Sequence, residues 1–579
     1  MKLSKKDKNF IIKSYKTMSI SDMARVLNTD ETSVIKFLSE KNLSINSLEE
    51  KKVSSTNYKK AENSKFKYFG NFEFLDIRSL LKKEIFFFLS ISLFIIVLYF
   101  RSFSGIILSD ESSMYETLSK GNVDWLQRFL ATDANHVVSF LIFGLNPTAN
   151  RVLAILLHLV NIVLFYYLFR NFINEKILKV GIILLSSHSL IVEPITWVAA
   201  NPYIYHAFLY LVIMISSFHF EKSMKWYFLI PYFSVLLILV LNGGHTNFAP
   251  IFATLFNIFI LGRSIKKELI ITGWLYLLIP YYSITNRATV DERIASLTTG
   301  PYLEKFINTL PFTVAKTIEL IVFPFNLALF HEETMYPNYY TFARIFTIAF
   351  IVFSFYLLYK NKFIFGLYAI GFAYCIYIFS PVQISWFVAE RYNYFTVFIF
   401  CTLFAAVLFK IQEKFAYLAE GIFILYFFFF LFVTFNRFDK WENSILLWED
   451  NLRIAPDSYR VRNNLAENYN REGIYDKAIE QYKESIKRNP EFNEAYFNLA
   501  GALLKQNKLA EAEEVYKFLL NRNFNPQNVL LALAILTANR NEFSEAYQYL
   551  NLALANDPNS EYIKSLESEI KKYESNQKN

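Results

Sequence analysis

Long apolar runs alternate with short polar loops between residues 85 and 435. Eleven runs have about the length that an α-helix needs to cross the hydrocarbon core of a bilayer. They lie at 85–101, 151–170, 178–197, 203–219, 226–242, 246–262, 269–284, 341–359, 363–380, 392–409 and 417–435. The pattern predicts an all-α, polytopic membrane bundle over residues 85–437, preceded by a linker and juxtamembrane segment at 46–84.

Basic residues occupy alternate loops between these runs. The clusters lie at 82–83, 170–179, 222–225, 263–267, 360–362 and 410–414. By the positive-inside rule these loops are cytoplasmic. A topology of eleven spans places every one of these clusters on the cytoplasmic side, provided that residues 306–330 do not cross the membrane. This segment contains Pro311 and Pro324 and would dip into the outer face. The sequence then predicts a cytoplasmic N-terminus and an extracytoplasmic C-terminus.

The composition agrees with this class of protein. A mean hydropathy above zero over 579 residues indicates a polytopic membrane protein rather than one soluble core. The net charge of +8 is then explained by cytoplasmic loops and not by nucleic-acid binding. Cys375 and Cys401 both lie in apolar runs, so we expect neither a disulfide framework nor a cysteine metal cluster. About 80 mostly polar residues precede the first run, which is therefore expected to be an uncleaved anchor.

Beyond the last apolar run, the hydrophobic pattern recurs every 34 residues. The recurring positions are Pro456 and Pro490, then Leu465, Leu499 and Leu533, and then Ala478, Ala512 and Ala546. This period is typical of tetratricopeptide repeats, in which each unit is a pair of antiparallel helices that buries its apolar face only by stacking on the next unit. We therefore predict a tetratricopeptide α-solenoid over residues 458–560.

The predicted solenoid has three units and two flanking segments. The units are 458–491, 492–525 and 526–559, after a connecting helix at 438–457 and before a polar C-terminal tail at 561–579. The concave face of such arms generally binds extended peptide, which predicts an acceptor or partner protein. A structural spacer is the alternative that the sequence leaves open.

The first 45 residues form a separate small unit in this interpretation. Residues 7–43 contain three short amphipathic patterns whose spacing resembles a helix-turn-helix domain. The candidate base-reading side chains are weak ones, namely Glu31, Thr32, Ser33 and Lys36. A cytoplasmic docking unit is therefore favoured over contact with nucleic acid.

Polar residues of the predicted outer face supply the candidate chemistry. Asp110 and Glu111 follow the first span, where an acidic pair marks either a site or cation, or simply a solvated loop. Arg391 either pairs locally with its neighbour Glu390 or clamps a phosphate with two hydrogen bonds. Other polar outer residues are His188, Glu193, His245, Asp124, Asp133 and His136. Lone histidines at span ends are more often interfacial hydrogen-bonding groups than ligands.

Four further stretches follow one another in a recognisable order. They are 157–161 together with 188–198, then FPFNL at 323–327, AERY at 389–392, and 441–456 leading into the repeats. Together they resemble the transmembrane and tetratricopeptide-repeat-containing proteins, which are O-mannosyltransferases of the GT-C fold, and their bacterial relatives. The resemblance covers about residues 85–560.

The resemblance implies transfer of a sugar from a polyprenyl-phosphate carrier to a hydroxyl group on the outer side of the membrane. It implies that Asp110, supported by Glu111, acts as the base toward the acceptor hydroxyl or helps to hold a divalent metal, since a hydroxyl must lose its proton during attack. A cation should then stabilise the departing lipid phosphate. The predicted cation is Arg391, with Arg287, Arg293 and His245 as alternates and with His188, Glu193 and Glu390 in support.

Two positions depart from the pattern of these relatives. A Ser-Lys-Glu turn common in them is replaced by GGHT at 243–246, and Gly-Arg-Lys-like residues are replaced by Ala200, Asn201 and Pro202. A non-catalytic membrane scaffold that recruits partners through its arm is therefore the alternative. A transporter is less favoured because few charged residues lie inside the spans. The predicted outer segments contain no Asn-x-Ser/Thr acceptor, which together with the helix-turn-helix-like start favours the plasma (inner) membrane of a bacterium.

Overall fold

The computed structural model describes residues 77–104, 146–241, 249–276, 302–329, 331, 339–374, 388–558 and 560–578. Within these ranges the regular elements are helices, and the only β-type contact is an isolated antiparallel bridge between His331 and Val388. The predicted all-α class is therefore confirmed for the described part of the chain. The predicted unit at 1–45 lies outside it, as do residues 46–76 of the predicted linker and juxtamembrane segment at 46–84.

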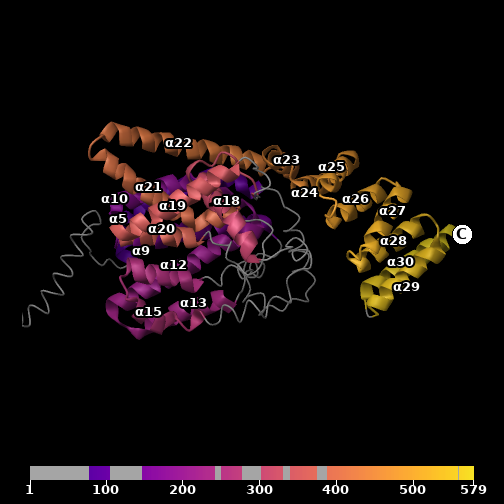
Figure 1. The fold of residues 1–579 in the computed structure, drawn as a ribbon, viewed down its shortest axis with the longest axis horizontal. Helices are drawn as coiled ribbons and strands as arrows, with labels where there is room; N and C mark the ends of the chain where they lie inside the picture. The colour runs from indigo at the N-terminus through magenta and orange to yellow at the C-terminus, as the bar shows by residue number, and fades with distance from the viewer. Residues whose placement is uncertain are drawn as a thin grey trace, which may run out of the picture. The chain divides into compact units, whose positions relative to one another are not determined.

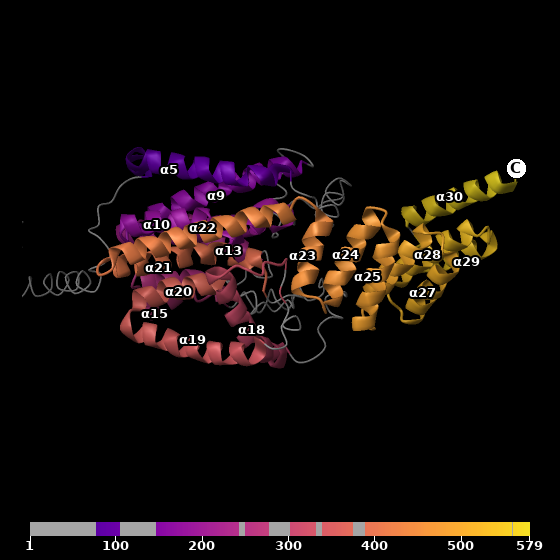
Figure 2. The ribbon, with the colours of Figure 1, turned by 90° about the horizontal axis from the view of Figure 1, so that it is seen from above.

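Six helices are long and apolar enough to cross a membrane, as far as the described residues extend. They are α5 (Ile77–Tyr99), α9 (Pro147–Phe169), α12 (Pro202–Ser223), α19 (Tyr340–Lys360), α21 (Tyr394–Gln412) and α22 (Ala416–Lys440). α5 continues into the 3-10 helix η1 (Phe100–Ser104). These helices, seen in Figures 1 and 2, indicate a membrane protein.

A seventh span is counted if one bent pair of helices crosses as a unit. α10 (Glu175–Ser186) is followed by η2 (Ser189–Ile191) and α11 (Val192–Thr196), and the two halves meet at 65°. η3 (Val198–Ala200) then leads into α12. The number of spans found, six or seven, is smaller than the eleven that the sequence predicts.

The remaining predicted spans correspond to shorter apolar helices. These are η4 (Trp226–Phe228) with α13 (Leu229–Leu241), α14 (Ala249–Leu255) with the π-helix η6 (Phe256–Ile260), α15 (Ile265–Thr272) and α20 (Lys362–Tyr374). Each of the predicted ranges 226–242, 246–262, 269–284 and 363–380 runs into residues that lie outside the described part of the chain. The count of eleven therefore stays a prediction.

α18 (Tyr302–Val322) is not among the candidate spans. It contains Pro311, and its buried Lys316 donates to Glu319 at 2.7 Å. The loop that follows, 323–329, has no regular secondary structure. This loop approaches the candidate site described below.

The C-terminal helices form pairs with a regular turn. After α23 (Ser444–Ile454) come the pairs α24 (Tyr459–Arg471) with α25 (Tyr475–Arg488), α26 (Asn493–Lys505) with α27 (Leu509–Asn521), and α28 (Pro526–Asn539) with α29 (Phe543–Asn556). Gly473, Asn507 and Asn541, which are 34 residues apart, all have positive φ at the turn inside a pair. Glycine and asparagine tolerate this left-handed conformation best.

Small residues allow the two helices of a pair to approach. Ala466, Ala478, Ala500 and Ala512 have no exposed surface. The amphipathic helix α30 (Glu561–Lys578) packs Ile563, Leu566 and Ile570 against the last pair and so covers its apolar face. The end of the stack is thereby closed, as a solenoid requires.

Candidate functional site

Four of the predicted site residues lie in the described part of the chain, namely His188, Glu193, Glu390 and Arg391. Asp110, Glu111, His245, Arg287 and Arg293 lie outside it. The geometry below therefore concerns the first group and its neighbours.

Two buried ion pairs form the centre of the candidate site. Arg391 Nη1 donates to Glu193 Oε1 at 2.7 Å, and Arg437 Nη2 donates to Glu390 Oε1 at 2.7 Å. We call these four residues the charge quartet. Glu193 comes from α11, Glu390 and Arg391 from η11 (Glu390–Asn393), and Arg437 from the last turn of α22. Arg391 thus pairs across the fold and not with its sequence neighbour.

Aromatic rings surround the charge quartet. The guanidinium carbon of Arg391 lies 4.8 Å from the ring centroid of Trp197 and 5.0 Å from that of Tyr392. Arg437 lies 5.8 Å from the ring of Trp441, which is itself 6.4 Å from Trp197. These rings exclude water, so the opposite charges interact more strongly here than at the surface.

The four members of the quartet differ in the fraction of their surface that is exposed to solvent. Glu193 and Glu390 are 0% exposed, Arg437 is 3% exposed and Arg391 is 7% exposed. Arg391 is therefore the member closest to the edge of the cluster. The two positive and two negative charges balance, which is the condition under which ionised groups are tolerated in an apolar interior.

Several polar atoms of the cluster are buried and have no hydrogen-bond partner among the residues that the structure describes. They are Oε2 of Glu193, Oε2 of Glu390, Nε of Arg437, and the indole Nε1 atoms of Trp197 and Trp441. Folded proteins leave few such atoms, and each usually points to a bound water or to a functional role. The cluster therefore offers both donors and acceptors beyond those that its own ion pairs use.

Loop 323–329 packs against the quartet through its backbone. The Leu327 carbonyl accepts from Arg437 Nη1 at 3.2 Å, and the Leu329 carbonyl accepts from Arg391 Nη1 at 3.0 Å. The Leu329 N–H donates to Asn451 Oδ1 of α23 at 2.9 Å. We call residues Leu327, Ala328 and Leu329 the strap. It joins the quartet to the helix that precedes the repeats.

His331 follows the strap and donates its backbone N–H to the Val388 carbonyl at 2.8 Å. Burial lowers the pKa of His331 well below its usual value, and the nearby cations Lys316 and Arg437 lower it further. The imidazole of His331 is therefore neutral at physiological pH. It adds no positive charge to the quartet.

Residues 157–161 contact α21 (Tyr394–Gln412), the helix that begins directly after η11, which carries Glu390 and Arg391 of the quartet. His158 Nδ1 lies 2.7 Å from Tyr394 Oη, and Asn161 Nδ2 donates to the same oxygen at 3.2 Å. Tyr394 is the first residue of α21, directly after η11. Residues 157–161 are thereby connected to the helix that directly follows η11.

The contacts of His188 are made with residues other than the quartet. Its Nδ1 accepts from the Leu190 N–H at 3.3 Å, and its Nε2 lies 3.0 Å from the Ile321 carbonyl oxygen. The ring packs 4.2 Å from that of Phe430 and is fully buried. Both ring nitrogens thus have partners, so His188 fixes the bend after α10.

Comparison with known families identifies one part of the chain. Residues 463–527 match the tetratricopeptide repeat family. The match confirms the tetratricopeptide arm that the 34-residue period predicts, and tetratricopeptide repeats commonly mediate protein–protein interaction. No curated protein matches the chain.

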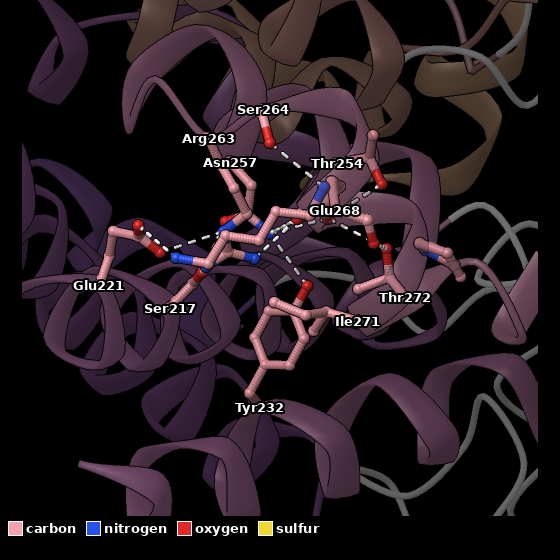
Figure 3. A network of polar contacts seen from close by, with 12 residues as sticks. Ser217, Glu221, Tyr232, Thr254, Asn257, Arg263, Ser264, Glu268, Ile271 and Thr272 are labelled. Atoms are coloured by element: carbon pink, nitrogen blue, oxygen red, sulfur yellow. Dashed lines mark hydrogen bonds and ion pairs between the residues drawn. The ribbon is translucent and has the colours of Figure 1, made fainter. Parts of the chain in front are cut away.

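A second buried polar network joins α12, η6 and α15 (Figure 3). Arg263 Nη1 donates to Glu268 Oε2 at 2.6 Å, and Asn257 Nδ2 donates to Glu268 Oε1 at 2.9 Å. Further members are Ser217, Glu221, Tyr232, Thr254, Lys267 and Thr272. The sequence predicts a basic cytoplasmic loop here, and the structure adds that Arg263 and Glu268 are buried, which the charge pattern did not indicate. The side of the membrane stays a prediction.

Within the described residues, the polar atoms at the centre of this network are paired with one another, so none is left to bind a ligand. No side-chain atom of Asn257, Arg263 or Glu268 is both buried and without a partner in the described part of the chain. It also joins the π-turn of η6 to the start of α15. We therefore assign it a structural role.

Two buried arginines, Arg437 of the quartet and Arg151, are not among the residues that the sequence singles out. Arg151 is 1% exposed and donates its Nε to the Thr196 carbonyl at 2.8 Å, beside Trp197. Both arginines lie at the ends of apolar runs, where a basic residue usually marks the membrane boundary. As for a metal, the described residues contain no group of three or more His, Cys, Asp or Glu that could hold one.

Proposed function

We propose that the chain is a membrane glycosyltransferase that moves a mannose-like hexose from a polyprenyl-phosphate carrier to a hydroxyl group, such as a protein Ser or Thr, on the extracytoplasmic side. The supporting observation is the meeting of stretches 188–198, 323–327, 389–392 and 441–456 at the charge quartet. These stretches carry the resemblance to the GT-C enzymes and are separated by up to about 250 residues. Their meeting at one place is expected if they build one site.

In this proposal Asp110 takes the proton of the acceptor hydroxyl and Glu111 supports it. Arg391 faces the lipid phosphate, because it is the most exposed member of the quartet. Its charge is already balanced by Glu193 at 2.7 Å. A departing phosphate therefore requires further cations, for which Arg287, Arg293 and His245 are the candidates.

Sugar transfer in membranes tests the proposal. Labelled polyprenyl-phosphate hexoses serve as donors, and the wild type is compared with Asp110→Asn and with the control Asp124→Asn in the same predicted loop. We expect transfer by the wild type and by the control, and a loss of about a hundredfold or more in Asp110→Asn, as for removal of a general base. Equal activity in all three proteins would remove Asp110 from the mechanism.

A non-catalytic scaffold is the second candidate, and one observation favours it. At the positions where related enzymes carry basic residues, Asn201 donates Nδ2 to the Pro194 carbonyl at 2.7 Å and Pro202 begins α12. Ala200 is fully buried. This turn therefore presents no cation to a donor phosphate. Absence of transfer from every donor, with the protein folded and inserted, would establish the scaffold in place of the enzyme.

A further inference from the structure

Leu329 is held through both sides of its backbone by residues from different parts of the chain. Its N–H donates to Asn451 Oδ1 at 2.9 Å, and its carbonyl accepts from Arg391 Nη1 at 3.0 Å. A single residue of the strap, Leu329, thus connects Asn451 to Arg391. A shift of Leu329 changes both hydrogen bonds together.

Asn451 belongs to the helix that carries the repeats. It lies on α23, which packs against α24, the first helix of the tetratricopeptide arm. Tyr469 of α24 also donates its hydroxyl to Glu449 of α23 at 2.6 Å. α23 is therefore fixed to the arm on one side and to the strap on another.

The orientation of the Asn451 amide is set by its own helix. Asn451 is 1% exposed, and its Nδ2 donates to the Leu447 carbonyl at 2.6 Å. The oxygen is thereby left facing the Leu329 N–H. An asparagine is suited to this place because it donates and accepts at once, whereas a leucine of similar size does neither.

The strap depends on these side chains because it lies in no helix or sheet. Its hydrogen bonds at Leu327 and Leu329 are made to Arg437, Arg391 and Asn451. A buried backbone N–H that loses its partner is costly, so the strap moves or opens when Asn451 is replaced. Arg391 uses the same Nη1 for Leu329 and Glu193, so its guanidinium moves with the strap.

We propose that Asn451 is a positioning residue through which the tetratricopeptide arm fixes Leu329 and, through Leu329, the guanidinium of Arg391. The link to the donor phosphate rests on the proposed function, whereas the link between Asn451, Leu329 and Arg391 does not. A protein that binds the arm and shifts α23 acts on the site by this route. The coupling is reciprocal, as any linkage between two binding sites is.

Hydrogen exchange of the full-length protein in lipid nanodiscs tests the structural link. The variants are Asn451→Leu and Asp450→Asn, a control on the same helix whose carboxylate pairs, within the described residues, with Lys440 and Arg453. We expect the exchange of the Leu329 amide and of amides 389–393 to rise about tenfold or more in Asn451→Leu, since loss of about 1.4 kcal/mol is tenfold. Asp450→Asn stays within about twofold of the wild type. Protection in Asn451→Leu equal to that of the wild type overturns the proposal.

The transfer assay then tests the link to the donor. We expect Asn451→Leu to raise the KM for the polyprenyl-phosphate sugar about tenfold with little change in kcat, whereas Asp450→Asn keeps the KM of the wild type. Faster exchange with an unchanged KM overturns the positioning of Arg391 toward the donor. If the wild type shows no transfer, the proposed function fails while the exchange result still decides the structural link. If Asn451→Leu does not fold, Asn451→Ala takes its place in both measurements.

Discussion

Within the described residues, the carboxylate of Glu193 forms its ion pair with Arg391. The pair is separated by 198 residues in sequence, and both side chains are almost completely buried. Such a pair adds little net stability compared with apolar residues of the same shape, but removal of one partner leaves an uncompensated charge in an apolar interior. The pair therefore behaves as a unit.

Glu193→Gln should lower the free energy of unfolding by about 3 kcal/mol, because Arg391 loses its counter-charge in a buried site. The measurement is denaturant or thermal unfolding in detergent. The control is Glu413→Gln, which removes the partner of Lys410 in an exposed pair of similar length. That change should stay within about 0.5 kcal/mol.

Replacement of both partners completes this test. Glu193→Gln combined with Arg391→Met should recover part of the stability lost in Glu193→Gln alone, since no unpaired charge remains. Equal stability losses in Glu193→Gln and Glu413→Gln would show that Glu193 is not buried with Arg391 in the folded protein.

The sequence identified Glu193, Glu390 and Arg391 as candidate residues but did not predict their pairing. The sequence left two alternatives for Arg391, a local pair with Glu390 or a clamp on a phosphate. The structure pairs Glu390 with Arg437 and Arg391 with Glu193 in place of the local pair, and the phosphate clamp stays a prediction. Pairing across the fold depends on which helix ends meet, and the hydrophobic pattern of one sequence carries no information on that.

At the scale of elements, α10 and α21 approach each other through Gly181. A Cβ atom at Gly181 would lie 3.0 Å from Thr402 Cα and 3.2 Å from the Cys401 carbonyl oxygen. Both atoms belong to the backbone of α21, so a flexible side chain cannot make room. The two helices must separate to admit a methyl group.

Gly181→Ala should therefore cost about 1–3 kcal/mol of stability, as over-packing of a tight interface does. Gly421→Ala is the matched control, because a Cβ atom at Gly421 in α22 meets nothing within 4 Å. The control should be neutral or stabilising by up to about 1 kcal/mol, since alanine favours a helix over glycine. Unfolding in detergent compares the two variants. A stability loss in Gly421→Ala equal to that in Gly181→Ala would contradict the close helix contact.

The sequence predicted helices well where it specifies both the helix and the turn that ends it. The arm shows this, because the turn residues Gly473, Asn507 and Asn541 recur with the same 34-residue period as the apolar positions. The predicted span at 178–197 shows the opposite, since it is bent by 65° between α10 and η2. At the bend His188 accepts from the Leu190 N–H, and Ser187 donates to the Leu184 carbonyl. Hydropathy does not register such local hydrogen bonds.

At the scale of the whole molecule, the sequence predicts which side of the membrane each part occupies. The described part of the chain has six or seven helices suited to crossing a membrane, by their length and composition. The orientation therefore depends on the basic loops alone. An odd number of spans places the N-terminus and the tetratricopeptide arm on opposite sides.

Labelling of single cysteines with a membrane-impermeant maleimide tests this orientation. Lys571 on α30 and Lys225 before η4 are both exposed, and a background with Cys375→Ser and Cys401→Ala removes the native thiols. We expect Lys571→Cys to react in intact cells and Lys225→Cys to react only after the membrane is opened. The reverse result would place the arm and the charge quartet on the cytoplasmic side, away from an extracytoplasmic acceptor. Labelling of both in intact cells would require an even number of crossings between residues 225 and 571, against the seven that the eleven-span topology predicts there.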